Sequence, residues 1–264
     1  MPEARPRKAR ILAVANQKGG VGKTTTAINL GAALARRDRR VLLVDLDPQG
    51  NASTGLGCPP EAREVTSFDL LLGEATPQEA ARETANPDLW LVPSTPDLSG
   101  ADLELAGRPG RTALLRGALR QPLMDELAFD YVLIDCPPSL NVLTINALVA
   151  AHAVLVPLQS EFFALEGLSQ LMLTIREVRQ SANPSLRIEG VALTMMDRRT
   201  SLAQQVEQDA RENLGDLVFQ TVIPRNVRLS EAPSHGTPVL DYDPASAGAT
   251  AYRALAAELL ARET

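Results

Sequence analysis

Aromatic residues are scarce in this chain of 264 residues and make up only 3% of it, although 45% of the residues are hydrophobic. The core must therefore be packed with leucine, valine, isoleucine and alanine, and a chain of this length can bury a sizeable core. No apolar run approaches the roughly 20 residues that a membrane-spanning helix needs. The first ten residues are charged and interrupted by proline, unlike a signal peptide, so we expect a cytoplasmic protein.

Cysteine is equally rare, with Cys58 and Cys136 as the only two. Neither has a partner at metal-binding spacing, which argues against a disulfide framework and against an iron–sulfur protein. Positive charge is also limited, because the net charge is −6 and the pI is about 5.1. An acidic chain binds nucleic acid poorly as a whole, so any DNA contact must use a local basic patch.

Short apolar runs alternate with helical patterns along most of the chain. Most of the runs are continuously apolar, which is typical of parallel strands covered on both faces. The alternation predicts an α/β fold with a doubly wound, mostly parallel sheet and helices on both faces. The expected strands are residues 11–15, 41–45, 89–93, 131–135, 153–158, 188–194 and 218–223. The expected helices are residues 23–37, 111–127, 139–150, 165–181, 201–214 and 249–261.

A glycine-rich loop lies between the first expected strand and the first expected helix. Glycines let the backbone turn tightly with its N–H groups aimed inward, and the helix N-terminus adds a positive dipole end. Lys23 should then reach the β- and γ-phosphates of a nucleoside triphosphate, and the Thr24 hydroxyl should bind Mg²⁺. The predicted nucleotide-binding residues of the loop are Lys18, Gly19, Gly20, Val21, Gly22, Lys23, Thr24 and Thr25.

This loop predicts the domain organisation as well. We expect residues 10–264 to form one P-loop ATPase domain and residues 1–9 to form a flexible tail. Residues 56–110 are rich in proline, glycine and charge. We expect surface loops and short helices there, without a second domain.

The loop departs from the general phosphate-loop pattern at its start. That pattern has glycine six residues before the lysine, where this chain has Gln17, and a second lysine, Lys18, follows directly. A lysine this close to the phosphates either helps to bind its own nucleotide or reaches the nucleotide of a partner. A solvated loop charge is the alternative interpretation.

Two expected strands end in aspartate. Residues 41–44 lead into Asp45 and Asp47, and residues 131–134 lead into Asp135. Ligands of α/β sheets lie beyond the carboxyl ends of the strands, where carboxylates can face Mg²⁺ or an attacking water. Together with the loop, this placement favours a functional role for Asp47 and Asp135, while Asp45 is closer to a structural residue. A strand-end cap or a loop charge remains the alternative for each.

The loop with two lysines resembles the deviant Walker A family of P-loop ATPases. This family includes ParA/Soj partition ATPases, MinD division-site ATPases, the nitrogenase iron protein and iron–sulfur carriers of the Mrp type. The resemblance is strongest to ParA/Soj proteins and covers nearly the whole chain except residues 1–8 and parts of residues 59–110. It is carried by residues 18–24, 41–53, 131–140, 161–170 and 221–233.

The resemblance implies residue roles that spacing alone does not give. ATP would close a face-to-face homodimer in which Lys18 of each subunit reaches the nucleotide of the other. Asp47 would position or activate the attacking water. Pro224 and Asn226 would frame the adenine. Arg199 and Arg228 would hold DNA without sequence preference.

The DNA assignment needs a basic strip on an acidic protein. Two copies in a dimer would double its phosphate contacts, which carry non-specific affinity. The alternative is that these arginines pair with surface acids such as Asp197 and Glu231. The strip would consist of Arg198, Arg199, Arg225 and Arg228.

The function implied by the resemblance is ATP-dependent DNA partitioning. A dimer with Mg-ATP would bind double-stranded DNA, and hydrolysis stimulated by a ParB/Spo0J-like centromere-binding protein would release it from the nucleoid. The alternative is a MinD-like positioning ATPase at a membrane, which needs a basic amphipathic segment. The C-terminal helix does carry an apolar stripe, but its polar face has mixed charge, so we expect it to pack in the core. The stripe consists of Tyr252, Leu255, Ala256, Leu259 and Leu260.

Overall fold

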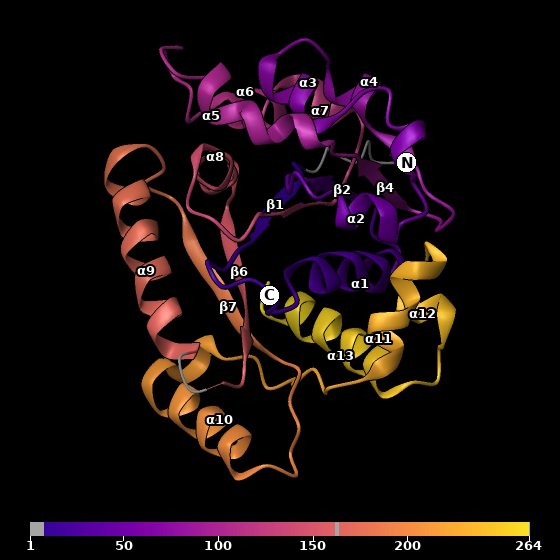
Figure 1. The fold of residues 1–264 in the computed structure, drawn as a ribbon, viewed down its shortest axis with the longest axis vertical. Helices are drawn as coiled ribbons and strands as arrows, with labels where there is room; N and C mark the ends of the chain where they lie inside the picture. The colour runs from indigo at the N-terminus through magenta and orange to yellow at the C-terminus, as the bar shows by residue number, and fades with distance from the viewer. Residues whose placement is uncertain (1–7, 162–163, 264) are drawn as a thin grey trace, which may run out of the picture.

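The computed structural model describes residues 8–161 and 164–263 and contains a seven-stranded sheet (Figure 1). The strand order is β3-β4-β2-β5-β1-β6-β7, and every pair is parallel except β3 with β4. The predicted doubly wound, mostly parallel sheet is thus confirmed. The strands are β1 (Arg10–Val14), β2 (Val41–Asp45), β3 (Arg82–Glu83), β4 (Leu89–Val92), β5 (Tyr131–Asp135), β6 (Ala153–Gln159) and β7 (Arg187–Thr194).

Helices cover both faces of the sheet, because alternate strand residues point to opposite sides and both sides are apolar. Figure 1 shows α1 beside α13 on one face, with α9 across the sheet. One face carries α1 (Lys23–Ala35), α2 (Asn51–Gly55), α11 (Val227–Glu231), α12 (Val239–Tyr242) and α13 (Ala247–Ala261). The other carries α3 (Ser67–Leu72), α4 (Pro77–Ala80), α5 (Ala101–Glu104), α6 (Leu114–Leu119), α7 (Pro122–Glu126), α8 (Val142–Ala150), α9 (Ala164–Ser181) and α10 (Ser201–Leu214). Four 3₁₀ turns span Pro60–Ala62, Pro96–Gly100, Gly215–Leu217 and Ala232–His235.

The strand expected at residues 218–223 is not formed. Its ends do lie along β7, since the N–H of Phe219 donates to the carbonyl of Val191 and the N–H of Ile223 donates to that of Leu193. Between them, the N–H groups of residues 220 and 221 bind the Glu258 carboxylate on α13, at 2.7 and 2.8 Å. The N–H of residue 221, which would face β7 in a regular strand, is thus lost to the ladder, and only isolated bridges remain.

The helix expected at residues 111–127 is split in two. Pro122 has no N–H to donate and forces the preceding Gln121 into an extended conformation, so α6 ends before it and α7 begins with it. The two-residue strand β3 was not expected. Its antiparallel pairing with β4 lies inside the irregular stretch of residues 56–110, which otherwise contains the short helices that we expected. Of the expected tail, residues 1–7 lie outside the described residues.

The apolar stripe of α13 packs in the core, as expected. Tyr252, Leu255, Ala256 and Leu259 are buried against α1 and its neighbours, and Leu260 is partly buried. No helix in the described part of the chain is long and apolar enough to cross a membrane.

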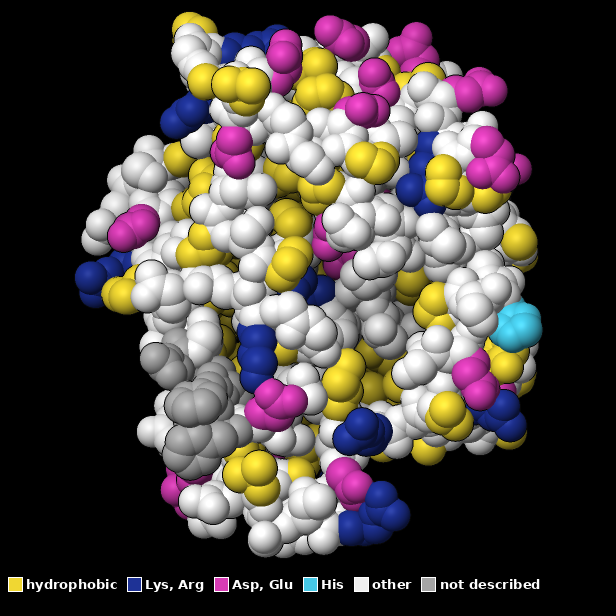
Figure 2. Space-filling model, in the orientation of Figure 1, with side chains coloured by type: hydrophobic (Ala, Val, Ile, Leu, Met, Phe, Trp, Pro, Cys, Tyr) yellow, Lys and Arg dark blue, Asp and Glu magenta, His cyan; other side chains and the backbone are white. Residues whose placement is uncertain are grey.

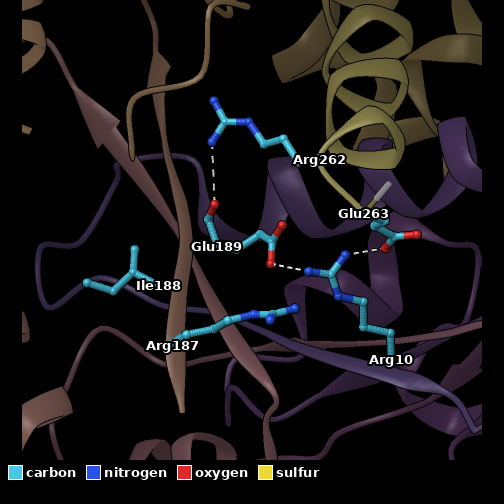
Figure 3. Close-up of a pocket in the computed structure, with 6 residues that line it drawn as sticks. All are labelled: Arg10, Arg187, Ile188, Glu189, Arg262 and Glu263. Atoms are coloured by element: carbon cyan, nitrogen blue, oxygen red, sulfur yellow. Dashed lines mark hydrogen bonds and ion pairs between the residues drawn. The ribbon is translucent and has the colours of Figure 1, made fainter. Parts of the chain in front are cut away.

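A polar network joins α13 to the amino-terminal edge of the sheet (Figure 3). The Arg10 guanidinium forms ion pairs with Glu189 on β7 and with Glu263 just after α13. Arg262 extends from the same helix end toward the carbonyl of Glu189. The hollow between these side chains has a volume of about 480 Å³, but it lies at the edge opposite the phosphate loop. We interpret the hollow as a by-product of these ion pairs, whose role is structural because they join α13 to the sheet.

Replacing Arg10 with methionine should destabilise the fold by about 2 kcal/mol, because the buried Glu189 carboxylate would lose its cation. The double variant Arg10→Met/Glu189→Leu should recover most of that loss, since it removes both charges together. Urea unfolding of the three proteins measures both effects. A double variant as unstable as Arg10→Met would show that the lost stability comes from packing and not from the unpaired charge.

Candidate functional site

The phosphate loop connects β1 to α1 at the carboxyl edge of the sheet. Gly20 and Gly22 have φ values of 75° and 83°, a left-handed conformation that favours glycine, and Gly22 is the residue that precedes α1. The Thr194 hydroxyl at the end of β7 donates a 2.9 Å hydrogen bond to the carbonyl of Val21 and ties the loop to the sheet. The loop backbone is therefore arranged as a cradle at a helix N-terminus, where anions bind.

Lys23 is buried at the first position of α1. Its ammonium donates a 3.0 Å hydrogen bond to the carbonyl of Lys18 across the loop. Burial lowers the pKa of Lys23, while the charges of Asp135 and Asp47 oppose that shift. The ammonium is thus held inside the turn that a phosphate would occupy.

Asp45 and Asp135 end neighbouring strands and are register partners, so both carboxyls lie at the same edge as the loop. Both oxygens of the fully buried Asp135 carboxyl lack a normal hydrogen bond from the described residues, although the Thr24 side chain approaches it. Burial, and next the charge of Asp45, raise the pKa of Asp135 well above its ordinary value. An orphaned buried carboxyl beside a threonine hydroxyl provides the oxygen donors that Mg²⁺ prefers.

Asp45 is satisfied within the protein. Its carboxylate accepts hydrogen bonds from the N–H and hydroxyl of Ser53, at 2.8 and 2.7 Å, and from the N–H of Asp47 at 3.2 Å. Burial raises its pKa to about 6. This pattern agrees with the structural role expected for Asp45.

Asp47 lies at the head of the tight turn that follows β2. The N–H of Gln49 donates to its carboxylate at 3.0 Å, and the N–H of Gly50 donates to its carbonyl at 2.9 Å. Asp47 is buried, with 8% of the residue exposed, so its carboxylate is not solvated like a free loop charge. The turn fixes both the backbone and the carboxylate of Asp47.

The Lys18 side chain binds a residue outside the phosphate loop. Its ammonium forms an ion pair with Glu161 after β6, and both side chains are more than one third exposed. An exposed pair of this kind contributes little stability and can exchange partners. Lys18 is therefore available to a group outside its own loop.

Pro224 and Asn226 line a cavity of about 150 Å³ beside Gly22 and Thr25. Its apolar and polar lining suits a heterocycle next to a phosphate cradle. Sequence reasoning did not assign Tyr252, which lines the same cavity and whose hydroxyl lies 3.1 Å from that of Thr26. Its helical spacing predicted only core packing, and that is also true.

Two of the four arginines of the expected basic strip, Arg199 and Arg228, are paired with acids. Arg199 is 89% exposed and binds Asp197 through two hydrogen bonds of 2.8 and 2.7 Å, which lower the pKa of Asp197 to about 2. Arg228 binds Glu231 at 2.8 Å and Asp243 at 3.3 Å. In Figure 2, lysine and arginine side chains stand singly or in small groups, several beside acids. One chain thus presents no continuous basic surface on this face.

Taken together, the loop, the buried ammonium, the orphaned carboxyl and the cavity fit a nucleoside triphosphate with Mg²⁺. The cradle N–H groups and Lys23 can neutralise phosphate oxygens, and Thr24 with Asp135 can hold the cation. Such an arrangement can support phosphoryl transfer to water by positioning and electrostatic stabilisation.

Comparisons with known proteins identify the family. Residues 9–188 match the AAA domain family. The chain is 59% identical to the chromosome partitioning protein ParA of Caulobacter vibrioides, over 96% of this chain and 95% of that protein, and 50% identical to the sporulation initiation inhibitor protein Soj of Bacillus subtilis, over 96% and 98%. The chain also resembles a solved structure of Mycobacterium smegmatis cobyrinic acid a,c-diamide synthase with a bound ATP analog and magnesium. The two sequences are 42% identical, the match covers 97% of this chain and 96% of that chain, and the TM-score is 0.82. The chain belongs to the ParA/Soj family of P-loop ATPases.

Proposed function

We propose that residues 10–264 form one ATPase domain that partitions chromosomal or plasmid DNA. The observation that carries this proposal is a complete triphosphate cradle with a second, exchangeable lysine, in a chain closely related to chromosome partitioning proteins. The reaction is hydrolysis of ATP to ADP and phosphate. Fold alone does not determine function, so particular residues must account for each step of the reaction.

Substrate binding depends on the loop. The N–H groups of residues 19–25 and the Lys23 ammonium hold the β- and γ-phosphates, which replace the carbonyl of Lys18 as the partner of Lys23. Thr24 would bind Mg²⁺ directly, and Asp135, together with Asp47, would hold the ion through water. The cation supplies charge neutralisation on the phosphates. Pro224 and Asn226 frame the adenine.

Hydrolysis depends on a second copy of the chain. Lys18 leaves Glu161 and reaches the nucleotide of the partner, so the site is complete only in an ATP-bound dimer. Asp47, fixed by its turn, orients the attacking water. Turnover by the dimer alone is slow, and a ParB/Spo0J-like protein accelerates it.

DNA binding follows dimerisation. Arg199 and Arg228 exchange their acidic partners for phosphates, and two copies place two such strips on one body. The chain is then associated with the nucleoid while ATP is bound. Binding to random-sequence duplex with ATP, with ADP and without nucleotide tests this function. If liposomes and not DNA retained the ATP state, the MinD-like membrane alternative would replace it, although the burial of the α13 stripe opposes that alternative.

Replacing Asp47 with alanine should slow ATP hydrolysis by about 10²-fold, since the water would lose its positioning group. ATP binding should persist, so the variant should accumulate as dimer in sedimentation velocity. Lys18→Ala is the matched contrast, because it should bind ATP and fail to dimerise productively. An Asp47→Ala protein that stays monomeric with ATP would assign Asp47 another role, and normal dimerisation of Lys18→Ala would remove the trans role of Lys18.

A further inference from the structure

Arg63 is a buried arginine whose hydrogen bonds all go to neutral oxygens. It lies between the 3₁₀ turn at Pro60–Ala62 and α3 and is 8% exposed. None of the ion pairs found in residues 8–161 and 164–263 includes it. Burying a charge without a counter-ion is unfavourable unless the surrounding acceptors are well placed, so its location requires an explanation. Its acceptors are the carbonyls of Gly50, Cys58 and Ser94 and the hydroxyl of Thr54.

Two of these acceptors hold the turn of Asp47. The guanidinium donates to the carbonyl of Gly50 at 3.3 Å, and Gly50 closes the turn through its N–H bond to the Asp47 carbonyl. The Arg63 guanidinium also donates to the carbonyl of Ser94 at 2.9 Å. The Ser94 hydroxyl in turn donates to the same Asp47 carbonyl. Arg63 therefore holds the two residues whose donors fix the backbone of Asp47.

The turn lies directly on the guanidinium. Gly50 has a φ of 62°, and a Cβ added to it would lie 2.1 Å from Nη1 of Arg63. The close approach leaves no room for the turn to move toward Arg63, and the hydrogen bonds oppose movement away from it. A planar fork can serve these separated carbonyls at once, whereas a lysine ammonium is a single point that cannot.

We propose that Arg63 is the positioning residue of Asp47, which keeps its carboxylate where the attacking water must be oriented. This inference rests on the proposed role of Asp47. Arg63 contacts neither nucleotide nor water and acts through the turn. Its replacement should therefore change the rate of hydrolysis and leave the binding of ATP nearly unchanged.

The test is a double-mutant cycle in the full chain. Arg63→Lys should lower single-turnover hydrolysis of Mg-ATP by about 10–100-fold and change ATP affinity by less than about threefold. In the Asp47→Ala background, Arg63→Lys should have no further effect, because the group that it positions is absent. Equal rate losses in both backgrounds, or no loss in the wild-type background, would overturn the proposal. If Asp47→Ala alone leaves hydrolysis unchanged, the role of Asp47 fails first, which is a distinct result.

Arg82→Lys is the matched control. Arg82 bonds the same segment, at the Cys58 sulfur and the Ala62 carbonyl, and has no hydrogen bond to Gly50 or Ser94 among the described residues. The Arg82→Lys variant should hydrolyse Mg-ATP at a rate within about twofold of the wild-type rate. Should Arg63→Lys not fold, Ser94→Ala tests the same chain of contacts, because it deletes only the hydroxyl that holds the Asp47 carbonyl. Ser94→Ala should lower hydrolysis at unchanged ATP affinity, and a normal rate in that variant would overturn the proposal.

Discussion

Replacing Lys23 with alanine should weaken Mg-ATP binding by about 10²–10⁴-fold. The ammonium is the buried cation of the cradle, and each charge-assisted hydrogen bond to phosphate contributes about 1.5–3 kcal/mol. Loss of two such bonds accounts for the expected change in affinity. The fold should survive, because in the nucleotide-free chain Lys23 makes one hydrogen bond to a neighbouring carbonyl. Calorimetric titration with Mg-ATP, together with urea unfolding, separates the two effects.

Lys8→Ala provides the control for charge. It removes the same group at an exposed position before β1, at the opposite edge of the sheet, and should keep normal ATP affinity. If Lys23→Ala also bound ATP normally, the cradle would not be the triphosphate site.

ATP should raise the affinity for random-sequence duplex DNA by about 10²–10⁴-fold over ADP. A single chain of net charge −6 neutralises few phosphates, so it releases few counterions and binds weakly. Dimerisation joins two arginine strips, and the second then binds at high effective concentration. Asp47→Ala can hold the ATP state during mobility-shift or biolayer measurements. The affinity should not depend on the DNA sequence, and it should fall steeply as the salt concentration rises.

Charge reversal identifies the strip. Arg199→Glu and Arg228→Glu should each lower the affinity of the ATP state for DNA by more than about tenfold. Each substitution is present in both subunits of a dimer, and each leaves a neighbouring acid without its cation. Arg187→Glu makes the same charge change on an exposed residue at the opposite edge of the sheet and should have a small effect. Equal affinity with ADP and ATP, or equal losses in all three variants, would contradict the model of two strips.

The sequence predicts most of the sheet because its strands are buried on both faces. Continuous apolar runs such as Val41–Asp45 and Tyr131–Asp135 leave little choice of structure, and their observed bounds agree with the predicted ones. Residues 218–223 have the same apolar character but different hydrogen-bond partners. The carboxylate of Glu258, 37 residues further along the chain, accepts the N–H of residue 221 that a strand would need. Local patterns cannot reveal such a partner.

The candidate site, like the sheet, is only partly predictable from the sequence. The cradle and the strand-end aspartates follow from short-range spacing, and the structure brings Lys23, Thr24 and Asp135 together. The pairing of Lys18 with Glu161 spans 143 residues, and the link from Arg63 to Ser94 spans 31. Both depend on tertiary packing, so neither could be derived from the spacing of residues in the sequence.

Both edges of the sheet are protected against unwanted strand pairing. At one edge, β3 has two residues and runs antiparallel, so it offers a neighbouring chain very few free backbone groups. At the other, residues 218–224 lie along β7 and occupy some of its carbonyls. Long exposed edge strands are the usual templates for aggregation. Copies of the chain should consequently remain free of edge-to-edge polymerisation even at high concentration, which leaves the nucleotide-binding face as the surface for the proposed dimer.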